Sequence, residues 1–139
     1  MKRIDTRMVS RWLLAALFVA AGVNHFINPG PYVRIVPPYL PAAEALVFWS
    51  GVFEVLGGVG LLIRPVSRFA AWGLIALLVA VFPANLNMAL HPADFATIPA
   101  WVLWARLPLQ AVLIAWVWWT GLSRASGVAA SGSPGADLG

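Results

Sequence analysis

The sequence predicts an all-α membrane protein, built as a bundle of four transmembrane helices. Two features of composition predict this: 61% of the 139 residues are hydrophobic and only 10% are charged, with a mean hydropathy of +0.84. Soluble domains are nearer half apolar and a quarter charged. The third observation is that four apolar segments each reach about 20 residues, the length that crosses the hydrocarbon core of a bilayer. A chain this short forms one domain, predicted over residues 1–124.

The first predicted helix spans residues 9–27 and follows a basic start that contains Lys2, Arg3 and Arg7. A cleaved signal peptide is the alternative for this segment. A short apolar core follows the basic residues, and small residues stand at positions 20–22, which is the pattern of such peptides. If the segment is retained, it is the first helix of the bundle.

Residues 28–42 contain five prolines and separate the first two helices. Proline lacks the amide donor and restricts the residue before it, so no long helix forms here. We expect an ordered, proline-rich cap that lies at the outer surface of the plasma membrane. Tyr32 and Tyr39 suit the membrane interface.

Three further helices follow the cap. They are predicted over residues 42–63, 69–90 and 98–122. Pro83 is expected to kink the second of these three helices. The final residues, 125–139, are rich in Gly, Ser and Ala, and we expect them to form a disordered cytoplasmic tail.

Charge orients the four helices. With the N-terminus inside, the outer loops hold Arg34 alone, whereas the inner side holds seven basic residues, which is a clear positive-inside bias. These seven are Lys2, Arg3, Arg7, Arg11, Arg64, Arg68 and Arg124. The sequence therefore predicts a multi-pass protein of the plasma (inner) membrane with both termini in the cytoplasm. The first and third helices both begin after an arginine and end in a stretch with Asn and His, which suggests a repeat of two helix pairs.

Glu54 is the one charged residue near the middle of the second helix, with nine uncharged residues on either side. An ionised side chain at the centre of a spanning helix costs roughly 2.5–3.5 kcal/mol. Arg106 is the only basic residue deep in a helix, and its depth differs from that of Glu54 by about four residues, roughly 6 Å. We therefore predict that the two side chains pair, directly or through Gln110 or water, because an unpaired buried charge is costly.

The remaining polar side chains fall at a similar depth, in the outer half of the bilayer, while the inner half is nearly all aliphatic. We expect them to form one cluster that opens outward under the cap. Its candidate ligand-binding residues are His25, Glu54, Asn85, Arg106 and Gln110, with Asn24, Tyr39 and Asn87 as secondary candidates. Intramembrane ionisable groups that face a bundle interior are functional candidates by default.

Structural alternatives stand beside each of these assignments. The Glu54–Arg106 pair could only fix the helix register, and His25 could only cap the end of its helix. Asn85 could satisfy backbone groups freed by Pro83. Around Glu54, the small residues Ser50, Gly51, Gly57 and Gly58 predict a stripe where a neighbouring helix approaches closely.

Several function classes are excluded or disfavoured. The net charge of +4 comes from basic residues at helix ends, so it does not indicate nucleic-acid binding. The chain has no cysteine and therefore no thiol chemistry, and its two histidines lack the spacing of a metal site. No phosphate-binding loop or catalytic serine arrangement is evident. A mostly apolar pocket with a few polar groups remains, which suits a quinone head group, another lipophile or a partner helix.

Four motifs are similar to those of the DoxX-like family of small bacterial membrane proteins, over about residues 10–120. They are Gly-x-x-His-Phe at 22–26, the PPYLP segment at 37–41, SGxxE at 50–54 and FPANxxMA at 82–89, followed by Arg-x-Pro-x-Gln at 106–110. The resemblance implies a four-helix membrane fold with the first helix retained. It also implies a link to quinone-dependent sulfur oxidation or to membrane redox complexes, although relatives act as assembly or trafficking factors. The absence of cysteine makes members with thiol relays a poor guide.

The leading hypothesis is a redox-associated membrane subunit that binds a quinone or other lipophile around Glu54 and Arg106. As an enzyme it would be at most a non-thiol accessory subunit of a quinone-linked oxidoreductase, with a quinone as the candidate cofactor. The second hypothesis is a non-catalytic assembly or interaction factor, and the third is a small-molecule transporter that works as an oligomer. The expected partners are the bilayer, a membrane or soluble redox protein, and further copies of the chain.

Overall fold

The computed structural model describes residues 3–123, which contain helices and no strands. Four of the helices in this part of the chain are long and apolar enough to cross a membrane, as the sequence predicts. They are α1 (Thr6–Ile27), α3 (Ala43–Gly60), α4 (Ser67–Leu90) and α5 (Ala100–Gly121). Their ends differ from the predicted ends by three residues at most. The predicted tail lies outside the described residues.

Local chemistry explains the two largest differences. The helix α1 begins at Thr6 because the Asp5 side chain caps it, accepting a hydrogen bond of 3.0 Å from the backbone N–H of Arg7. The helix α3 ends at Gly60 because the next amides tighten into a 3₁₀-like turn, in which Ile63 donates to the Gly60 carbonyl. Pro65 follows and cannot continue an α-helix.

Short helices connect the long ones, and each has a proline in its first turn. They are α2 (Pro29–Ile35), η1 (Arg64–Val66) and η2 (Pro92–Phe95). Proline suits this position because the first amides of a helix have no intrahelical partner. The proline-rich stretch therefore contains one short helix of seven residues, α2, rather than only an irregular cap.

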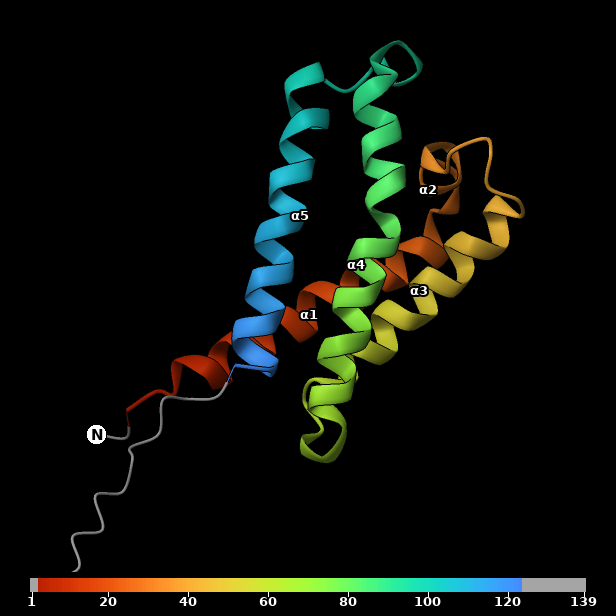
Figure 1. The fold of residues 1–139 in the computed structure, drawn as a ribbon. Coiled ribbons are helices and arrows are strands. Elements are labelled where there is room, and N and C mark those ends of the chain that lie inside the picture. Colours follow the sequence, from red (N-terminus) through yellow and green to blue (C-terminus); the bar gives the residue numbers. More distant parts are fainter. Residues whose placement is uncertain (1–2, 124–139) are drawn as a thin grey trace, which may run out of the picture.

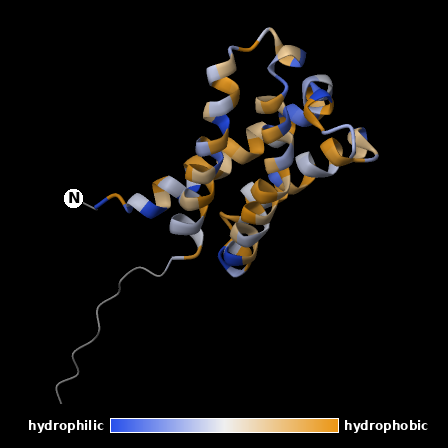
Figure 2. Ribbon diagram, turned by 45° about the horizontal axis from the view of Figure 1, so that its top comes forward, coloured by the Kyte–Doolittle hydropathy of each residue, from blue (hydrophilic) through white to orange (hydrophobic). Residues whose placement is uncertain are grey.

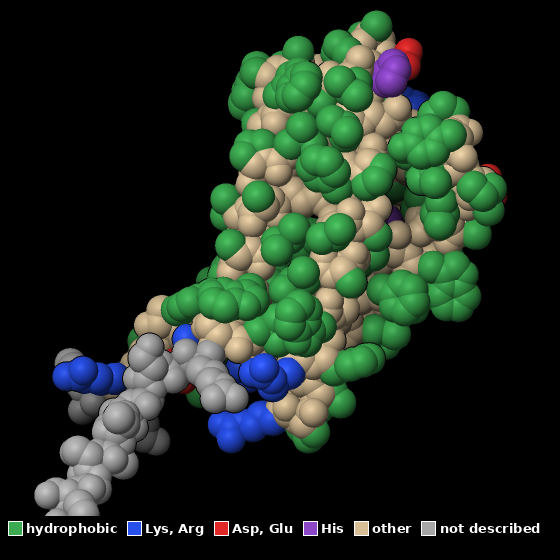
Figure 3. Space-filling view, in the orientation of Figure 1, with side chains coloured by type: hydrophobic (Ala, Val, Ile, Leu, Met, Phe, Trp, Pro, Cys, Tyr) green, Lys and Arg blue, Asp and Glu red, His purple; other side chains and the backbone are tan. Residues whose placement is uncertain are grey.

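The long helices form two pairs (Figure 1). The helix α1 packs along α3, α5 packs along α4, and the α1–α3 pair lies obliquely across the α4–α5 pair through contacts between α3 and α4. We call the end with the start of α1, η1 and the end of α5 the basic end, because arginine side chains gather there (Figure 3). The end with α2 and η2 is the cap end.

Most of the surface between these two ends is apolar (Figures 2 and 3). Large hydrophobic side chains are exposed on all four long helices, among them Trp12, Phe53, Phe69, Trp72 and Trp101. Apolar patches on soluble monomers rarely exceed a few hundred Å². A surface of this kind suits contact with lipid chains rather than with water.

The apolar core lies toward the basic end. Its fully buried side chains include Leu14 of α1, Leu74 of α4 and Val117 of α5, together with Leu61, which directly follows α3. This end is therefore mostly aliphatic inside, although Ser10, Ser67 and Thr120 are buried polar residues there. Buried Ser10 and Thr120 share a hydrogen bond of 2.8 Å there, which joins α1 to α5.

Arginines strengthen the same junction. The Arg7 guanidinium donates to the carbonyl of Ser123 at 2.7 Å, and Arg68 donates to the carbonyl of Leu122 at 3.2 Å. These carbonyls follow the last turn of α5, where unsatisfied acceptors give a helix its partial negative charge. The contacts therefore close the basic end of the bundle.

The small-residue stripe on α3 makes the close helix contacts that the sequence predicts. A Cβ atom added at Gly51 would lie 2.9 Å from the Cβ of His25, and one at Gly58 would lie 2.9 Å from a methyl carbon of Val19. Gly57 instead faces α4, because a Cβ there would lie 2.5 Å from a methyl carbon of Leu74. The stripe therefore serves two neighbours, α1 and α4.

Candidate functional site

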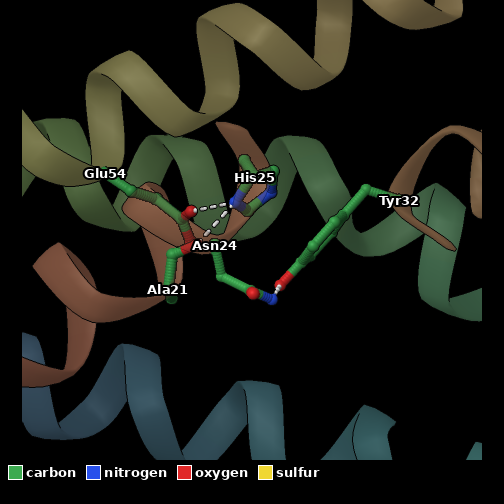
Figure 4. Close-up of polar contacts among 5 residues, drawn as sticks. All are labelled: Ala21, Asn24, His25, Tyr32 and Glu54. Carbon is green, nitrogen blue, oxygen red and sulfur yellow. Dashed lines mark hydrogen bonds and ion pairs between the residues drawn. The ribbon is translucent and has the colours of Figure 1, made fainter. Parts of the chain in front are cut away.

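Glu54 pairs with His25, and the distance between Oε2 of the carboxylate and Nδ1 of the imidazole is 3.0 Å (Figure 4). Both side chains are mostly buried, with 16% and 11% of their surface exposed. Close packing of α1 on α3 makes the pair possible. A Cβ at Gly22 would lie 2.7 Å from the carbonyl oxygen of Gly51, so only glycine fits at this crossing.

The second contact of His25 defines the position of its proton. Nδ1 also lies 2.8 Å from the carbonyl oxygen of Ala21, one turn earlier on α1. Both neighbours of Nδ1 are acceptors, so Nδ1 carries the hydrogen. In the neutral ring, Nε2 then has a free lone pair, and it has no hydrogen-bond partner among residues 3–123.

Glu54 is less well satisfied than its partner. Its Oε2 atom is buried, and although it lies close to Nδ1 it receives no aligned hydrogen bond within the described part of the chain. The Nδ1–H group is directed to the Ala21 carbonyl instead. A buried acceptor without a donor costs about 1–3 kcal/mol, and more if it is charged. Such groups are rare in proteins and mark sites where a proton or ligand changes the balance.

Tyr32 covers the pair from α2. Its ring stacks on the imidazole of His25, with ring centroids 3.9 Å apart, and its hydroxyl accepts a hydrogen bond of 2.6 Å from the Asn24 side chain (Figure 4). Asn24 and His25 are neighbours on α1, so two consecutive residues hold the ring in place.

A cavity of about 160 Å³ lies beside His25 and Tyr32, under the proline-rich segment. Its wall is mostly apolar and includes Pro37, which is fully buried, and Val47. Ser50 supplies one further polar group. The residues from α1, α2, α3 and α4 that line it therefore enclose a small chamber with a titratable ring in its wall.

His25 also lines a second cavity. It has a volume of about 650 Å³ and is lined by Phe26, Val33, Val47 and Phe48, with Glu44 among its residues. Phe26 and Phe48 meet edge to face, with centroids 5.3 Å apart, and both are well exposed. His25 therefore borders a second, mostly apolar cavity in addition to the small chamber.

Arg106 does not pair with Glu54, and this prediction was wrong. Within residues 3–123 the acid forms its ion pair with His25. The helix α3 packs between α1 and α4, whereas α5 packs against α4 and the basic-end part of α1. Similar depth therefore did not make Glu54 and Arg106 neighbours.

Arg106 instead lines a crevice at the cap end, with a volume of about 550 Å³. Its other polar residues are Asn24, Asn28, Tyr32, Arg34, Asp94 and Thr97. The helices α1 and α5 meet at the basic end but leave this space between them at the cap end, where α2 and η2 cover it. Tyr32 lines both this crevice and the small chamber, so its ring forms a shared wall.

Asn85 and Gln110 form a third group, away from the other two. The Asn85 amide donates to Oε1 of Gln110 at 3.0 Å, and Nε2 of Gln110 donates to the carbonyl oxygen of Leu78. Gln110 is buried. It lines a separate cavity of about 250 Å³ whose other lining residues are apolar. Leu78 lies one turn before Pro83, so the group joins α4 to α5 close to the proline. Asn85 itself donates to Gln110 and not to the carbonyl that Pro83 frees, which is that of Val79, so the structural alternative for Asn85 stays a prediction.

The two remaining candidates lie outside all three groups. Asn87 has its backbone carbonyl in the C-terminal cap of α4, where it accepts from the His91 amide at 3.1 Å. Tyr39 is 72% exposed. Sequence reasoning did not place Tyr32 at the site, because it lies seven residues after His25 across a proline break and shares no helical face with it.

The comparisons with known proteins can now be set beside this geometry. Residues 14–121 match a family described as a domain of unknown function, DUF8561. The chain belongs to this family. The match covers every candidate residue from His25 to Gln110. The comparisons with curated proteins and with solved structures gave no match.

Proposed function

We propose that this member of the DUF8561 family is a redox-associated subunit of the bacterial plasma membrane that binds a quinone or a similar lipophile at His25. The observation that carries the proposal is the buried His25–Glu54 pair, whose Oε2 atom lacks a hydrogen-bond donor, beside a small chamber. Resemblance of the chain to DoxX-like proteins supports the same function.

The size and polarity of the chamber suit a single ring. Its volume is about 160 Å³, and an apolar protein cavity of about 150 Å³ is known to bind benzene. A quinone head adds two oxygen atoms to such a ring. His25, Tyr32 and Ser50 are the polar groups that would meet them, while the apolar wall excludes water from the ring.

The imidazole is arranged to take a proton from a reduced head group. With the hydrogen on Nδ1, the Nε2 lone pair can accept a hydrogen bond from a hydroquinone hydroxyl. If the proton moves to Nε2, the ring becomes cationic and the carboxylate of Glu54 at 3.0 Å stabilises that charge. A base oriented by a second group is a recurring arrangement in proton transfer. In this proposal the electrons pass to a partner redox protein.

Access from the bilayer supports the lipophile. A cavity of about 650 Å³ that His25 also lines has aromatic and aliphatic side chains from α1, α2 and α3 in its wall. An isoprenoid-like tail would lie there while the head reaches His25. The orientation follows from charge: the basic end faces the cytoplasm, and the site lies in the outer half of the membrane.

Anaerobic binding of a short-chain benzoquinol tests the proposal, because its hydroxyl groups can donate to the Nε2 lone pair, with quenching of tryptophan fluorescence as the readout. We expect saturable binding by the native chain in nanodiscs and about tenfold weaker binding by His25→Gln and by Glu54→Gln, since hydrogen bonds to charged groups contribute about 1.5–3 kcal/mol. Asp5→Asn removes the same charge at the N-terminal cap of α1, where asparagine caps a helix as well as aspartate does, and it should bind within twofold of the native protein. Absence of saturable binding by the native protein contradicts the proposal.

One observation favours a second function, that of an assembly or interaction factor. A groove of about 590 Å³ between α3 and α4 is lined by small residues, including Gly57, Gly60 and Gly73, on the apolar surface. Small residues allow close approach of another transmembrane helix. Capture of the native complex followed by mass spectrometry separates the two functions. The second function is favoured if the native chain captures a stoichiometric partner protein that Gly73→Leu does not capture, and if the native chain binds no quinone.

A further inference from the structure

We propose that the crevice at the cap end binds a phosphate-type oxyanion, carried by a lipid head group or free in solution. Nothing in the quinone proposal requires this site. Its walls come from α1, α2, η2 and α5, and its volume of about 550 Å³ is much larger than one phosphate group.

Two guanidinium groups from different helices face this space. Arg106 projects from the apolar helix α5 and is half-buried, and Arg34 projects from the last turn of α2. Neither arginine forms an ion pair in the part of the chain that the structure describes. The side-chain amides of Asn24 and Asn28 also line the crevice and can donate hydrogen bonds to an oxyanion.

Charge in the crevice is unbalanced. Asp94 is the one carboxylate in its lining, against two arginines, and it lies too far from both for an ion pair. An arginine within a spanning helix is costly unless it has a partner or reaches water. A bound oxyanion would neutralise the excess positive charge, and the planar guanidinium matches two phosphate oxygens at once.

The surroundings suit a lipid as well as a free ion. Pro31, Ile35, Met88, Phe95 and Ile98 form an apolar lining below the polar groups. A phospholipid would place its phosphate at the arginines and its glycerol and upper acyl chain against these residues. The stacked ring of Tyr32 separates this position from the chamber beside His25. The two sites are therefore distinct, although they share one wall.

Native mass spectrometry of the delipidated full chain tests the site, with phosphatidylglycerol, phosphatidylcholine and inorganic phosphate as probes. We expect phosphatidylglycerol to bind at least tenfold more tightly than phosphatidylcholine. Arg106→Gln and Arg34→Gln should each weaken binding about tenfold, because a charge-assisted hydrogen bond contributes about 1.5–3 kcal/mol. Arg64→Gln removes the same charge at the basic end and should change binding less than twofold. Asp94→Asn should tighten it.

The outcomes separate the two sources of phosphate. If inorganic phosphate raises the melting temperature of the native chain and Arg106→Gln abolishes that shift, the site binds the free ion. If only phosphatidylglycerol raises the melting temperature and Arg106→Gln abolishes that rise, the site binds a lipid head group. The proposal is overturned if Arg64→Gln and Arg106→Gln weaken binding equally. It is also overturned if neither phosphatidylglycerol nor inorganic phosphate binds saturably. If Arg106→Gln does not fold, unchanged binding by Asp94→Asn overturns it instead.

Discussion

The two halves of the bundle share the same order of helices but differ in the polar residues that lie between their long helices. Each half has a long helix, a short helix that begins at proline, and a second long helix: α1–α2–α3 in the first half, and α4–η2–α5 in the second. The first helix of each half ends in the same way. The cap residues Asn28 and His91 have similar backbone angles, and their amides donate to Asn24 and Asn87, four residues earlier.

Each half also has one polar pair between its long helices. In the first half this pair is His25 with Glu54, which stands eleven residues after the start of α3. In the second half it is Asn85 with Gln110, which stands ten residues after the start of α5. The order of elements is thus the same in both halves, while the repeat of two helix pairs suggested by the sequence stays a prediction.

The difference lies in how well each pair is satisfied. Both polar atoms of the Gln110 amide have hydrogen-bond partners, and the other residues of the cavity that Gln110 lines are apolar. In the first half Glu54 Oε2 has no donor among the described residues, and His25 borders two cavities. A fully satisfied neutral pair stabilises a bundle, whereas an incompletely satisfied ionisable pair beside open space is a feature of a site. In the proposed function, the first half carries the ligand chemistry at His25, while the amide pair of the second half stabilises the bundle.

The largest effect is expected where the first half is most tightly packed. Gly22→Leu would force a side chain against the Gly51 carbonyl, which already lies 2.7 Å from a single added Cβ atom. We expect a loss of about 3 kcal/mol in the free energy of unfolding, at the upper end for overpacked cores, measured by denaturant titration in detergent. A Cβ at Gly73 meets nothing within 4 Å, so Gly73→Ala is the control. Equal losses in both variants would contradict the packing described here.

A smaller loss is expected from the amide pair of the second half. Gln110→Leu would leave Asn85 and the Leu78 carbonyl without their partner inside the bundle. The expected cost is about 2 kcal/mol, since a buried polar group left unsatisfied costs about 1–3 kcal/mol. Quinone affinity should stay within twofold of the native value. A selective loss of quinone binding with unchanged stability would reverse the assignment of the two halves.

The smallest effect on stability is expected at Glu54. Glu54→Gln keeps the shape of the side chain, and His25 retains its hydrogen bond to Ala21 as a neutral ring. The change removes a carboxylate whose Oε2 atom has no donor among the described residues, so little hydrogen bonding is lost and we expect a change of less than about 1 kcal/mol. The same denaturant titration measures it. A loss larger than that of Gln110→Leu would make the ionisable pair structural.

Hydropathy, charge and residue spacing predicted most of the fold. Four helices, their approximate ends and the small-residue stripe follow from properties that act along one helix, such as the length of an apolar run or the positions of Gly51 and Gly58. The candidate residues were chosen because polar side chains are rare in these segments, and their role stays a prediction. Each of these properties can be evaluated without knowing which helices are neighbours.

The partners of the candidate residues could not be predicted in the same way. Depth gives one coordinate of a side chain, and it was similar for Glu54 and Arg106. The helix that lies beside α3, and the direction in which each helix is rotated, depend on packing across the whole bundle. Tyr32 needed one further fact, that Pro29 starts a new helix which folds back over the end of α1.

The hydrogen bond between Ser10 and Thr120 has a mechanical consequence. It holds α1 and α5 together at the basic end, while the crevice separates them at the cap end. Asn24 lies fourteen residues beyond Ser10, about 21 Å along the helix at a rise of 1.5 Å per residue. With Ser10 as the pivot, a tilt of about three degrees moves Asn24 by about 1 Å. A small tilt of α1 can therefore change the width of the crevice by about 1 Å while the hydrogen bond between Ser10 and Thr120 stays intact.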